Sequence, residues 1–97
     1  MAKKGYWVVC YKSIDNPAVF SEYQRLARIA LDASGGHVIV GGLPAKVHEA
    51  GINQTVVIAE FETLEKALMA YETDLYKEAL RTLGTTVQRD FRILEGR

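Results

Sequence analysis

The sequence predicts an α+β fold: a four-stranded antiparallel sheet with its helices on one face. Strands are indicated by four runs rich in apolar and β-branched residues, at 6–11, 37–40, 55–61 and 86–94. Helices are indicated by two amphipathic segments, at 17–33 and 64–83. The order strand, helix, strand, strand, helix, strand is the ferredoxin-like βαββαβ arrangement. A chain of 97 residues has room for one such domain, which we take to span residues 1–97.

The first predicted strand is apolar on both of its faces. Side chains alternate along a strand, so its two sets are Trp7, Val9 and Tyr11 on one face and Tyr6, Val8 and Cys10 on the other. Neither set suits contact with solvent. Both faces of this strand are therefore expected to be covered.

The first helix is predicted from Pro17 to Ala33. Asn16 is suited to cap it, Pro17 suits a first position that needs no amide donor, and Gly35 suits its end. The expected buried stripe consists of Val19, Phe20, Tyr23, Leu26, Ala27, Ile29 and Ala30. The residues that fall mainly on the other side are Glu22, Gln24, Arg25, Arg28 and Asp32.

The middle of the chain is predicted to hold two strands joined by a loop. A short strand over 37–40 is interrupted by two glycines, and a loop continues to about Asn53. The next strand, over 55–61, is β-branched and apolar on both faces, which indicates a central position in the sheet.

The last third predicts a helical region followed by a strand. Thr63 is expected to cap the helix, a bend is expected at Thr73 and Asp74, and Gly84 is expected to end the region. The predicted inward residues are Leu64, Ala67, Leu68, Tyr71, Leu75, Ala79 and Leu80. The final strand is predicted over 86–94.

Two helical regions cover only one side of such a sheet, which predicts a partner on the other side. Depending on strand register, Trp7, Tyr11, Val56 and Ile58 could share one face, and that patch would exceed what monomers usually expose. A second copy is the simplest cover, because most oligomers are symmetric homo-oligomers. We therefore expect a homodimer formed through the open sheet face.

Composition argues against several classes of function. Lysine and arginine number 12, as do aspartate and glutamate, so there is no broad positive field for nucleic acid. The single cysteine, Cys10, allows no intrachain disulfide, and no apolar run approaches membrane-spanning length. We expect a cytoplasmic protein that contacts neither membrane nor nucleic acid. No phosphate loop, dinucleotide fingerprint or metal-ligand spacing is present, so we expect no cofactor and no metal.

Five segments together resemble domain of unknown function family 1330, and the likeness spans nearly the whole chain. The segments are Gly5–Val9, the Asn16-Pro17 helix start with Tyr23, 35–42, 57–61 and 90–96. The chain departs from the family pattern at His37, where arginine is expected, and at Glu62, where proline often follows the Glu-Phe pair. The resemblance implies a fold of the dimeric α+β barrel superfamily. It implies no established activity.

Glu60 and His37 are the candidate catalytic residues. Glu60 is a charge near the end of an apolar central strand, so it is either a pocket carboxylate or the ion-pair partner of Arg89 or Arg92. His37 begins a strand after a glycine turn, so it is either a base or an ordinary edge residue.

Four further side chains are candidates for ligand binding. Arg89 and Arg92 suit an anionic ligand, although cross-strand ion pairs are the alternative. Tyr23 and Tyr71 are helical aromatics, as is Tyr76, whose spacing also fits core packing. Cys10 is interpreted as a small buried hydrophobe rather than a nucleophile.

Two hypotheses for function remain open on these residues. The first is a cofactor-independent enzyme that binds a small apolar or carbonyl-bearing metabolite between sheet and helices. The dimeric barrel superfamily, which contains many small oxygenases and isomerases, favours an activity of that type by analogy of fold alone. The second is a non-catalytic dimer that binds a small molecule or presents an interaction surface.

Overall fold

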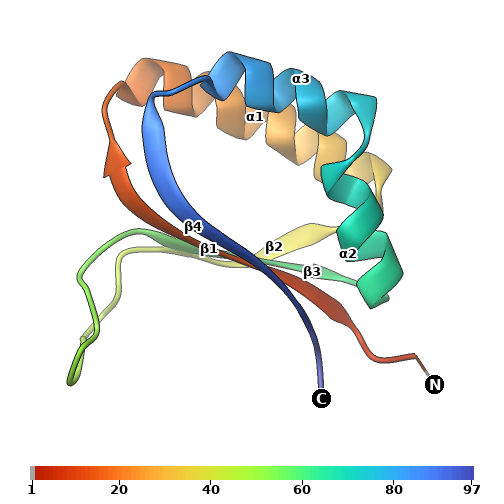
Figure 1. The fold of residues 1–97 in the computed structure, drawn as a ribbon, viewed down its shortest axis with the longest axis horizontal. Coiled ribbons are helices and arrows are strands. Elements are labelled where there is room, and N and C mark those ends of the chain that lie inside the picture. Colours follow the sequence, from red (N-terminus) through yellow and green to blue (C-terminus); the bar gives the residue numbers. More distant parts are fainter. Residues whose placement is uncertain (1) are drawn as a thin grey trace.

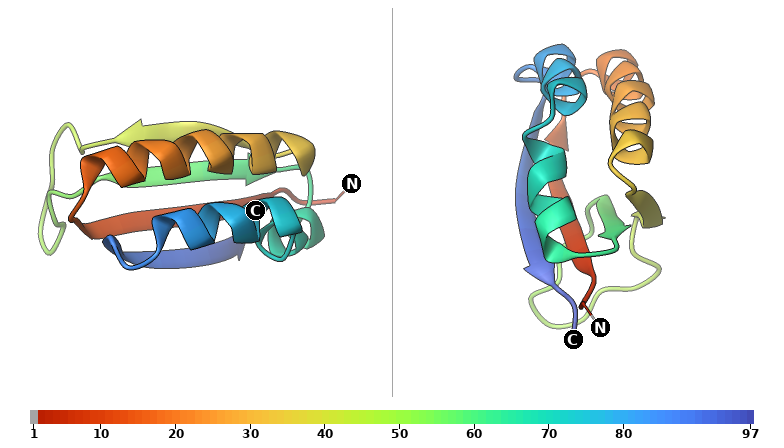
Figure 2. Two further views of the ribbon diagram at one scale, coloured as in Figure 1. Left: turned by 90° about the horizontal axis from the view of Figure 1, so that it is seen from above. Right: turned by 90° about the vertical axis from the view of Figure 1, so that its right-hand side faces the viewer.

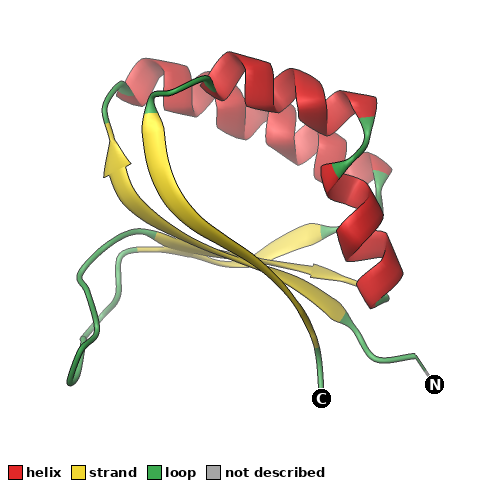
Figure 3. Cartoon of the chain, viewed as in Figure 1, coloured by secondary structure: helices red, strands yellow, loops and turns green. Residues whose placement is uncertain are grey.

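The computed structural model describes residues 2–97, which form four strands and three helices. In chain order these are β1 (Gly5–Ile14), α1 (Pro17–Ala33), β2 (His37–Gly42), β3 (Val56–Phe61), α2 (Leu64–Tyr71), α3 (Asp74–Leu83) and β4 (Val87–Glu95). Figure 1 follows the chain through them, and Figure 3 separates helices from strands by colour. None of the helices in this part of the chain has the length and apolar character to cross a bilayer.

The strands form one antiparallel sheet in the order β2-β3-β1-β4. All three helices lie on the same side of it, with α1 and α3 next to each other (Figure 2). This is the ferredoxin-like βαββαβ fold predicted from the sequence. The helical region between β3 and β4 is divided into α2 and α3.

Helix α1 has the predicted bounds and the predicted start. The Asn16 side-chain oxygen accepts hydrogen bonds from the amides of Ala18 (3.1 Å) and Val19 (3.2 Å), while Pro17 occupies the first turn. These bonds satisfy amide groups that have no partner inside the helix. Just past the C-terminal end, Gly35 has a φ of 74°, a conformation that glycine adopts without steric cost.

An aromatic cluster around Trp7 forms the centre of the core. The Trp7 ring lies 4.9 Å from Tyr76, 5.0 Å from Phe91 and 5.1 Å from Phe61, measured between centroids. Its indole nitrogen donates a hydrogen bond of 2.8 Å to the backbone oxygen of Ala67. The polar atom of this buried ring is therefore satisfied, and the ring links β1 to α2, β3, α3 and β4.

The register of the strands corrects one expectation about the sheet faces. Trp7 and Tyr11 face the helices and are buried, whereas Val56 and Ile58 pair with Cys10 and Val8 on the other side. The four predicted patch residues are thus divided between the faces. The face turned away from the helices, here called the open face, carries Tyr6, Val8, Cys10, Val56, Ile58, Glu60, Asp90, Arg92 and Leu94.

The helical region differs from its predicted stripe because it changes direction. The bend expected at Thr73 is the start of α3, where the Thr73 hydroxyl caps the amide of Tyr76. Leu75 therefore sits on a new helix with its own rotation and is 48% exposed, as is Leu68 on α2. The α1 residue Ile29 is also exposed, because α1 packs chiefly against α3 rather than across the whole sheet. Those three expectations of burial were wrong.

Strand β2 extends two residues further than predicted. It continues through Gly41 and Gly42, which pair with Val57 and Val56 of β3. The register shifts between Val38 and Val40, so a bulge at this point realigns the edge strand.

Candidate functional site

A cavity of about 700 Å³ lies between α1 and the helix-facing side of the sheet. It exists because the facing positions carry little side-chain volume: Ala27 on α1, Ala59 on β3, and Gly41 and Gly42 on β2. Helix α1 barely contacts β2, so the edge of the sheet stands away from the helix. This is a space of the size that small-molecule sites occupy in proteins.

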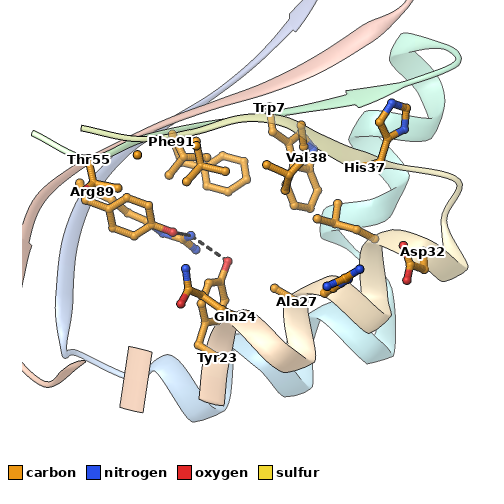
Figure 4. A pocket seen from close by; sticks show the side chains of 18 residues that line it. Trp7, Tyr23, Gln24, Ala27, Asp32, His37, Val38, Thr55, Arg89 and Phe91 are labelled. Atoms are coloured by element: carbon orange, nitrogen blue, oxygen red, sulfur yellow. Dashed lines mark hydrogen bonds between the residues drawn. The ribbon is translucent and has the colours of Figure 1, made fainter. Parts of the chain in front are cut away.

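The cavity is apolar in the middle and polar at both ends. Trp7 and Phe91 form the sheet-side wall, while Ala27 lies on the helix side (Figure 4). Arg89 lies at one end, and Asp32 and His37 lie at the other. A ligand in this space would meet aromatic rings along its body and polar groups at its ends.

Three tyrosine hydroxyls surround the guanidinium of Arg89. One terminal nitrogen donates to Tyr23 (3.0 Å) and more weakly to Tyr11 (3.4 Å), and the other donates to Tyr76 (3.2 Å). The hydroxyls of Tyr23 and Tyr76 lie 2.6 Å apart, so one of them donates a hydrogen bond to the other. We call these four residues the Arg89–tyrosine cluster. They come from β1, α1, α3 and β4, so only the tertiary fold assembles them.

Burial moves the pKa values of these phenols further above neutral pH. It raises the pKa of Tyr11 to about 12, with the neighbouring Tyr23 adding to the effect and Arg89 opposing it. Burial likewise raises the pKa of Tyr23 and of Tyr76. The cluster therefore presents neutral hydroxyls and a charged guanidinium rather than a phenolate.

These pKa values predict that the protein loses stability in strong alkali. A phenol whose pKa is higher in the folded state contributes stability below its unfolded pKa of 10.0, and that contribution declines as the pH rises toward about 12. For Tyr11 the effect is about 2–3 kcal/mol, by the usual conversion of a pKa shift. Chemical denaturation at a series of pH values should show a steeper decline for the wild type than for Tyr11→Phe. Equal slopes would contradict the proposed burial of the Tyr11 phenol.

Of the six predicted site residues, the structure places three at the cavity. Tyr23 and Arg89 form its polar end, and His37 lies at its rim with a side chain 62% exposed. Tyr71 does not line the cavity; its ring packs against Tyr76 and Phe91 behind the wall.

Glu60 lies on the open face, away from the cavity. It accepts a hydrogen bond of 2.9 Å from the Tyr6 hydroxyl, and its other oxygen lies 3.5 Å from Nε2 of His37. Neither Arg89 nor Arg92 is its partner, so the ion pair considered as an alternative is absent from residues 2–97. His37 is therefore the one predicted residue that adjoins both Glu60 and the cavity.

Arg92 also lies on the open face and pairs within its own strand. Its guanidinium donates to both carboxylate oxygens of Asp90, at 2.9 and 3.0 Å. The hydrogen bonds hold the pKa of Asp90 below its usual range. A shallow hollow of about 510 Å³ adjoins this pair and is lined by Val8, Cys10, Lys12, Ile52, Gln54, Asp90 and Arg92. Arg92 and Arg89 thus face opposite sides of the sheet.

Several residues at the cavity were not singled out from the sequence. Gln24, Arg28 and Asp32 line it, although they were assigned to the solvent side of α1. Their spacing of four residues places them along one flank of the helix, and that polar stripe was the available signal. Tyr11 had been treated only as a strand residue, and nothing local marks it as a partner of Arg89.

In the stretch from residue 2 to 97, no three His, Cys, Asp or Glu side chains converge in a way that could hold a metal ion. The polar groups that line the cavity include the guanidinium of Arg89, the phenols of Tyr11 and Tyr23, and the side chains of Asp32 and His37.

Comparison with solved structures supports the fold. A protein of unknown function from Rhodopseudomonas palustris, RPA0582, superposes with a TM-score of 0.75 at 14% identity, covering 100% of this chain and 85% of that one. SnoaB, a cofactor-independent oxygenase from Streptomyces nogalater, gives 0.65 at 14% identity, with 99% and 95% covered. A dimeric ferredoxin-like protein of unknown function from Thermobifida fusca gives 0.67 at 11% identity, with 98% and 92% covered. At these identities the likeness concerns the fold alone.

Comparison of the sequence itself is more specific about family. No curated protein matches the chain. The model of one protein family, by contrast, matches almost its whole length, as the resemblance of its strand and helix-start segments predicted. The chain belongs to the family described as Domain of unknown function (DUF1330), whose model matches residues 4–97.

Proposed function

We propose that this protein is a cofactor-independent enzyme, of oxygenase or isomerase type, that acts on a small metabolite bound between α1 and the sheet. The observation that carries the proposal is the cavity itself. Its apolar middle ends at a cluster of convergent hydrogen-bond donors, which is the usual composition of a site that binds and orients a small molecule.

The Arg89–tyrosine cluster would act on a carbonyl oxygen of the substrate. Removal of a proton from the carbon beside a carbonyl group places negative charge on the oxygen. Neutral hydroxyls and a fixed guanidinium aimed at that oxygen stabilise the charge without having to reorganise. In an isomerase-type reaction the same proton returns at another carbon, so the reaction needs no further reactant.

His37 is the proposed base, and Glu60 is its positioning residue. If Nε2 carries its proton toward the Glu60 carboxylate, 3.5 Å away, Nδ1 keeps the lone pair that accepts the substrate proton. Glu60 pairs with His37 in the register of β2 and β3, so both side chains leave the sheet on the open face, and Glu60 acts only through His37 at the rim of the cavity. The Tyr6 hydroxyl in turn holds the Glu60 carboxylate in place.

Relatives of similar fold give supporting context. SnoaB is described as a cofactor-independent oxygenase, and a structure from Caulobacter crescentus is described as a putative antibiotic biosynthesis monooxygenase. These descriptions apply to those proteins. They support the proposal for this chain to the extent that a shared fold provides a shared cavity.

The roles of His37 and Glu60 predict different losses once a substrate has been found in a metabolite screen. His37→Ala should lower kcat by about 100-fold or more, the usual contribution of a general base. Glu60→Gln should lower kcat less and shift the pH profile of kcat, since it changes only the partner of His37. His48→Ala is the matched control, because His48 is exposed and lies in the loop before β3. Unchanged turnover in His37→Ala would remove the proposed base.

A non-catalytic role in small-molecule binding is the second candidate. It is favoured by the position of the proposed base, because the His37 side chain is 62% exposed and shares the open face with Glu60. On this reading a ligand would bind with measurable affinity and leave unchanged. Product analysis after long incubation separates the two candidates.

The proposed active form is a homodimer assembled through the open face, in the cytoplasm. That face carries Val8, Val56 and Ile58 at its centre, and none of the helices within residues 2–97 covers it (Figure 1). The loop between β2 and β3 extends on the same side and exposes Leu43 and Ile52, at 67% and 66%. Apolar surface of this kind favours association with a second copy.

A further inference from the structure

We propose that the ligand of the cavity is an anion: a small planar carboxylate whose charged oxygens lie against Arg89. This inference rests on the proposed function only in taking the cavity as the binding site. It adds the charge of the ligand and its orientation in the cavity.

The first argument is the missing counter-ion of Arg89. Throughout residues 2–97, carboxylates pair with Arg25, Arg81, Arg92, Lys66 and His37, but none pairs with Arg89. Arg89 is nevertheless only partly exposed, in a cavity with aromatic walls. A charge withdrawn from water is usually paired, because its hydration has been lost. The hydrogen-bond partners of Arg89 within residues 2–97 are neutral hydroxyls. We therefore expect the ligand to supply the negative charge that balances the guanidinium.

The second argument is a surplus of donors. The three hydroxyls of the cluster carry three protons, and only one is used between Tyr23 and Tyr76. The guanidinium has five N–H groups, of which three are used on the tyrosines. Four hydrogens thus remain to be donated, two on hydroxyls and two on the guanidinium, whereas the guanidinium offers no acceptor and the hydroxyl oxygens already accept four bonds. A carboxylate, which only accepts, matches this set, whereas a neutral amide or alcohol brings donors of its own.

The third argument concerns the body of the ligand. The guanidinium carbon of Arg89 lies 4.9 Å from the ring centroid of Phe91, 5.4 Å from that of Tyr23 and 5.9 Å from that of Tyr11. These rings and Trp7 continue along the cavity wall, beside the small residues that leave it open (Figure 4). Flat apolar surfaces favour stacking with a flat apolar body. An aromatic carboxylate would thus place its ring between the walls and its charge at Arg89.

The test uses the only tryptophan of the chain, Trp7, which lines the cavity and reports its occupation by fluorescence. The probes are naphthalene-2-carboxylate and its uncharged isostere naphthalene-2-carboxamide, titrated at pH 7 and checked by calorimetry. We expect the carboxylate to bind about 10- to 100-fold more tightly, as hydrogen bonds between charged groups allow. Arg89→Gln should abolish this preference, whereas Arg25→Gln, on the exposed side of α1, should preserve it.

The outcomes separate this inference from the proposed function. Equal affinity of the two probes for the wild type would contradict the inference that the ligand is an anion. The cavity would remain the binding site. If neither probe changes the fluorescence or releases heat at millimolar concentration, the cavity is not a site for aromatic carboxylates and the inference falls, whereas the proposed function is decided by the metabolite screen. If Arg89→Gln unfolds, the comparison of the two probes on the wild type still decides. A preference that survives in a folded Arg89→Gln would also overturn the inference.

Discussion

Replacing Trp7 by alanine is expected to lower the free energy of unfolding by about 3–5 kcal/mol, the usual cost of truncating a buried large aromatic residue. Trp7 is 4% exposed and contacts the rings of Phe61, Tyr76 and Phe91. Its removal would leave a cavity where β1 meets the helices, next to the proposed binding site. Urea denaturation followed by circular dichroism measures the change.

Two further variants test whether the loss of stability comes from the buried position of the Trp7 ring. Trp7→Phe keeps most of the apolar contact but loses the 2.8 Å hydrogen bond to the Ala67 backbone oxygen, so it should cost about 1–2 kcal/mol. Met69→Ala, at a position 70% exposed on α2, should change the free energy by less than about 0.5 kcal/mol. A Trp7→Ala protein as stable as Met69→Ala would contradict the placement of this ring at the centre of the core.

Replacing Ile58 by lysine is expected to weaken the homodimer by at least about 100-fold in dissociation constant. Ile58 lies on the open face, paired with Val8 of β1 and Val40 of β2, so it is central in the surface proposed to meet the second copy. Each subunit of a symmetric dimer would bring its own lysine, and an unpaired charge in a dry interface is strongly unfavourable. Sedimentation velocity over a range of concentrations measures the shift from dimer to monomer.

The control for this variant carries the same charge elsewhere. Met69→Lys places lysine on the helical side of the molecule, where no contact with a second copy is proposed, and should leave the dimer intact. A wild-type protein that sediments as a stable monomer at micromolar concentration would remove the homodimer from the proposed function. A binding site within a single subunit would remain, because every residue of the cavity comes from one chain.

The sequence predicted those features of the fold that depend on local physical chemistry. Helix α1 begins at Pro17 because an Asn16-Pro17 pair both caps the helix and fits its first turn, and these effects act between near neighbours. The strands follow from alternation and β-branched content, and their order fixes the ferredoxin-like topology. The dimer and the catalytic roles of His37 and Glu60 stay predictions.

The burial of individual helical residues was predicted less well. Periodicity gives the apolar side of a helix but not the width of its contact with neighbouring elements. Leu75 was assigned to the stripe of an uninterrupted helix, and the cap at Thr73 starts a new one instead. Tyr76, expected in the core, is fully buried there.

By itself, the sequence determined the elements, their order and the presence of apolar residues on both faces of the sheet. The tertiary structure decided which side chains share a face, since a shift of one residue in register exchanges the two faces of a strand. It thereby placed Glu60 and Arg92 on the open face and Arg89 in the cavity. It also brought Tyr11, Tyr23 and Tyr76 to Arg89 across as many as 78 positions of sequence, a convergence that no local pattern records.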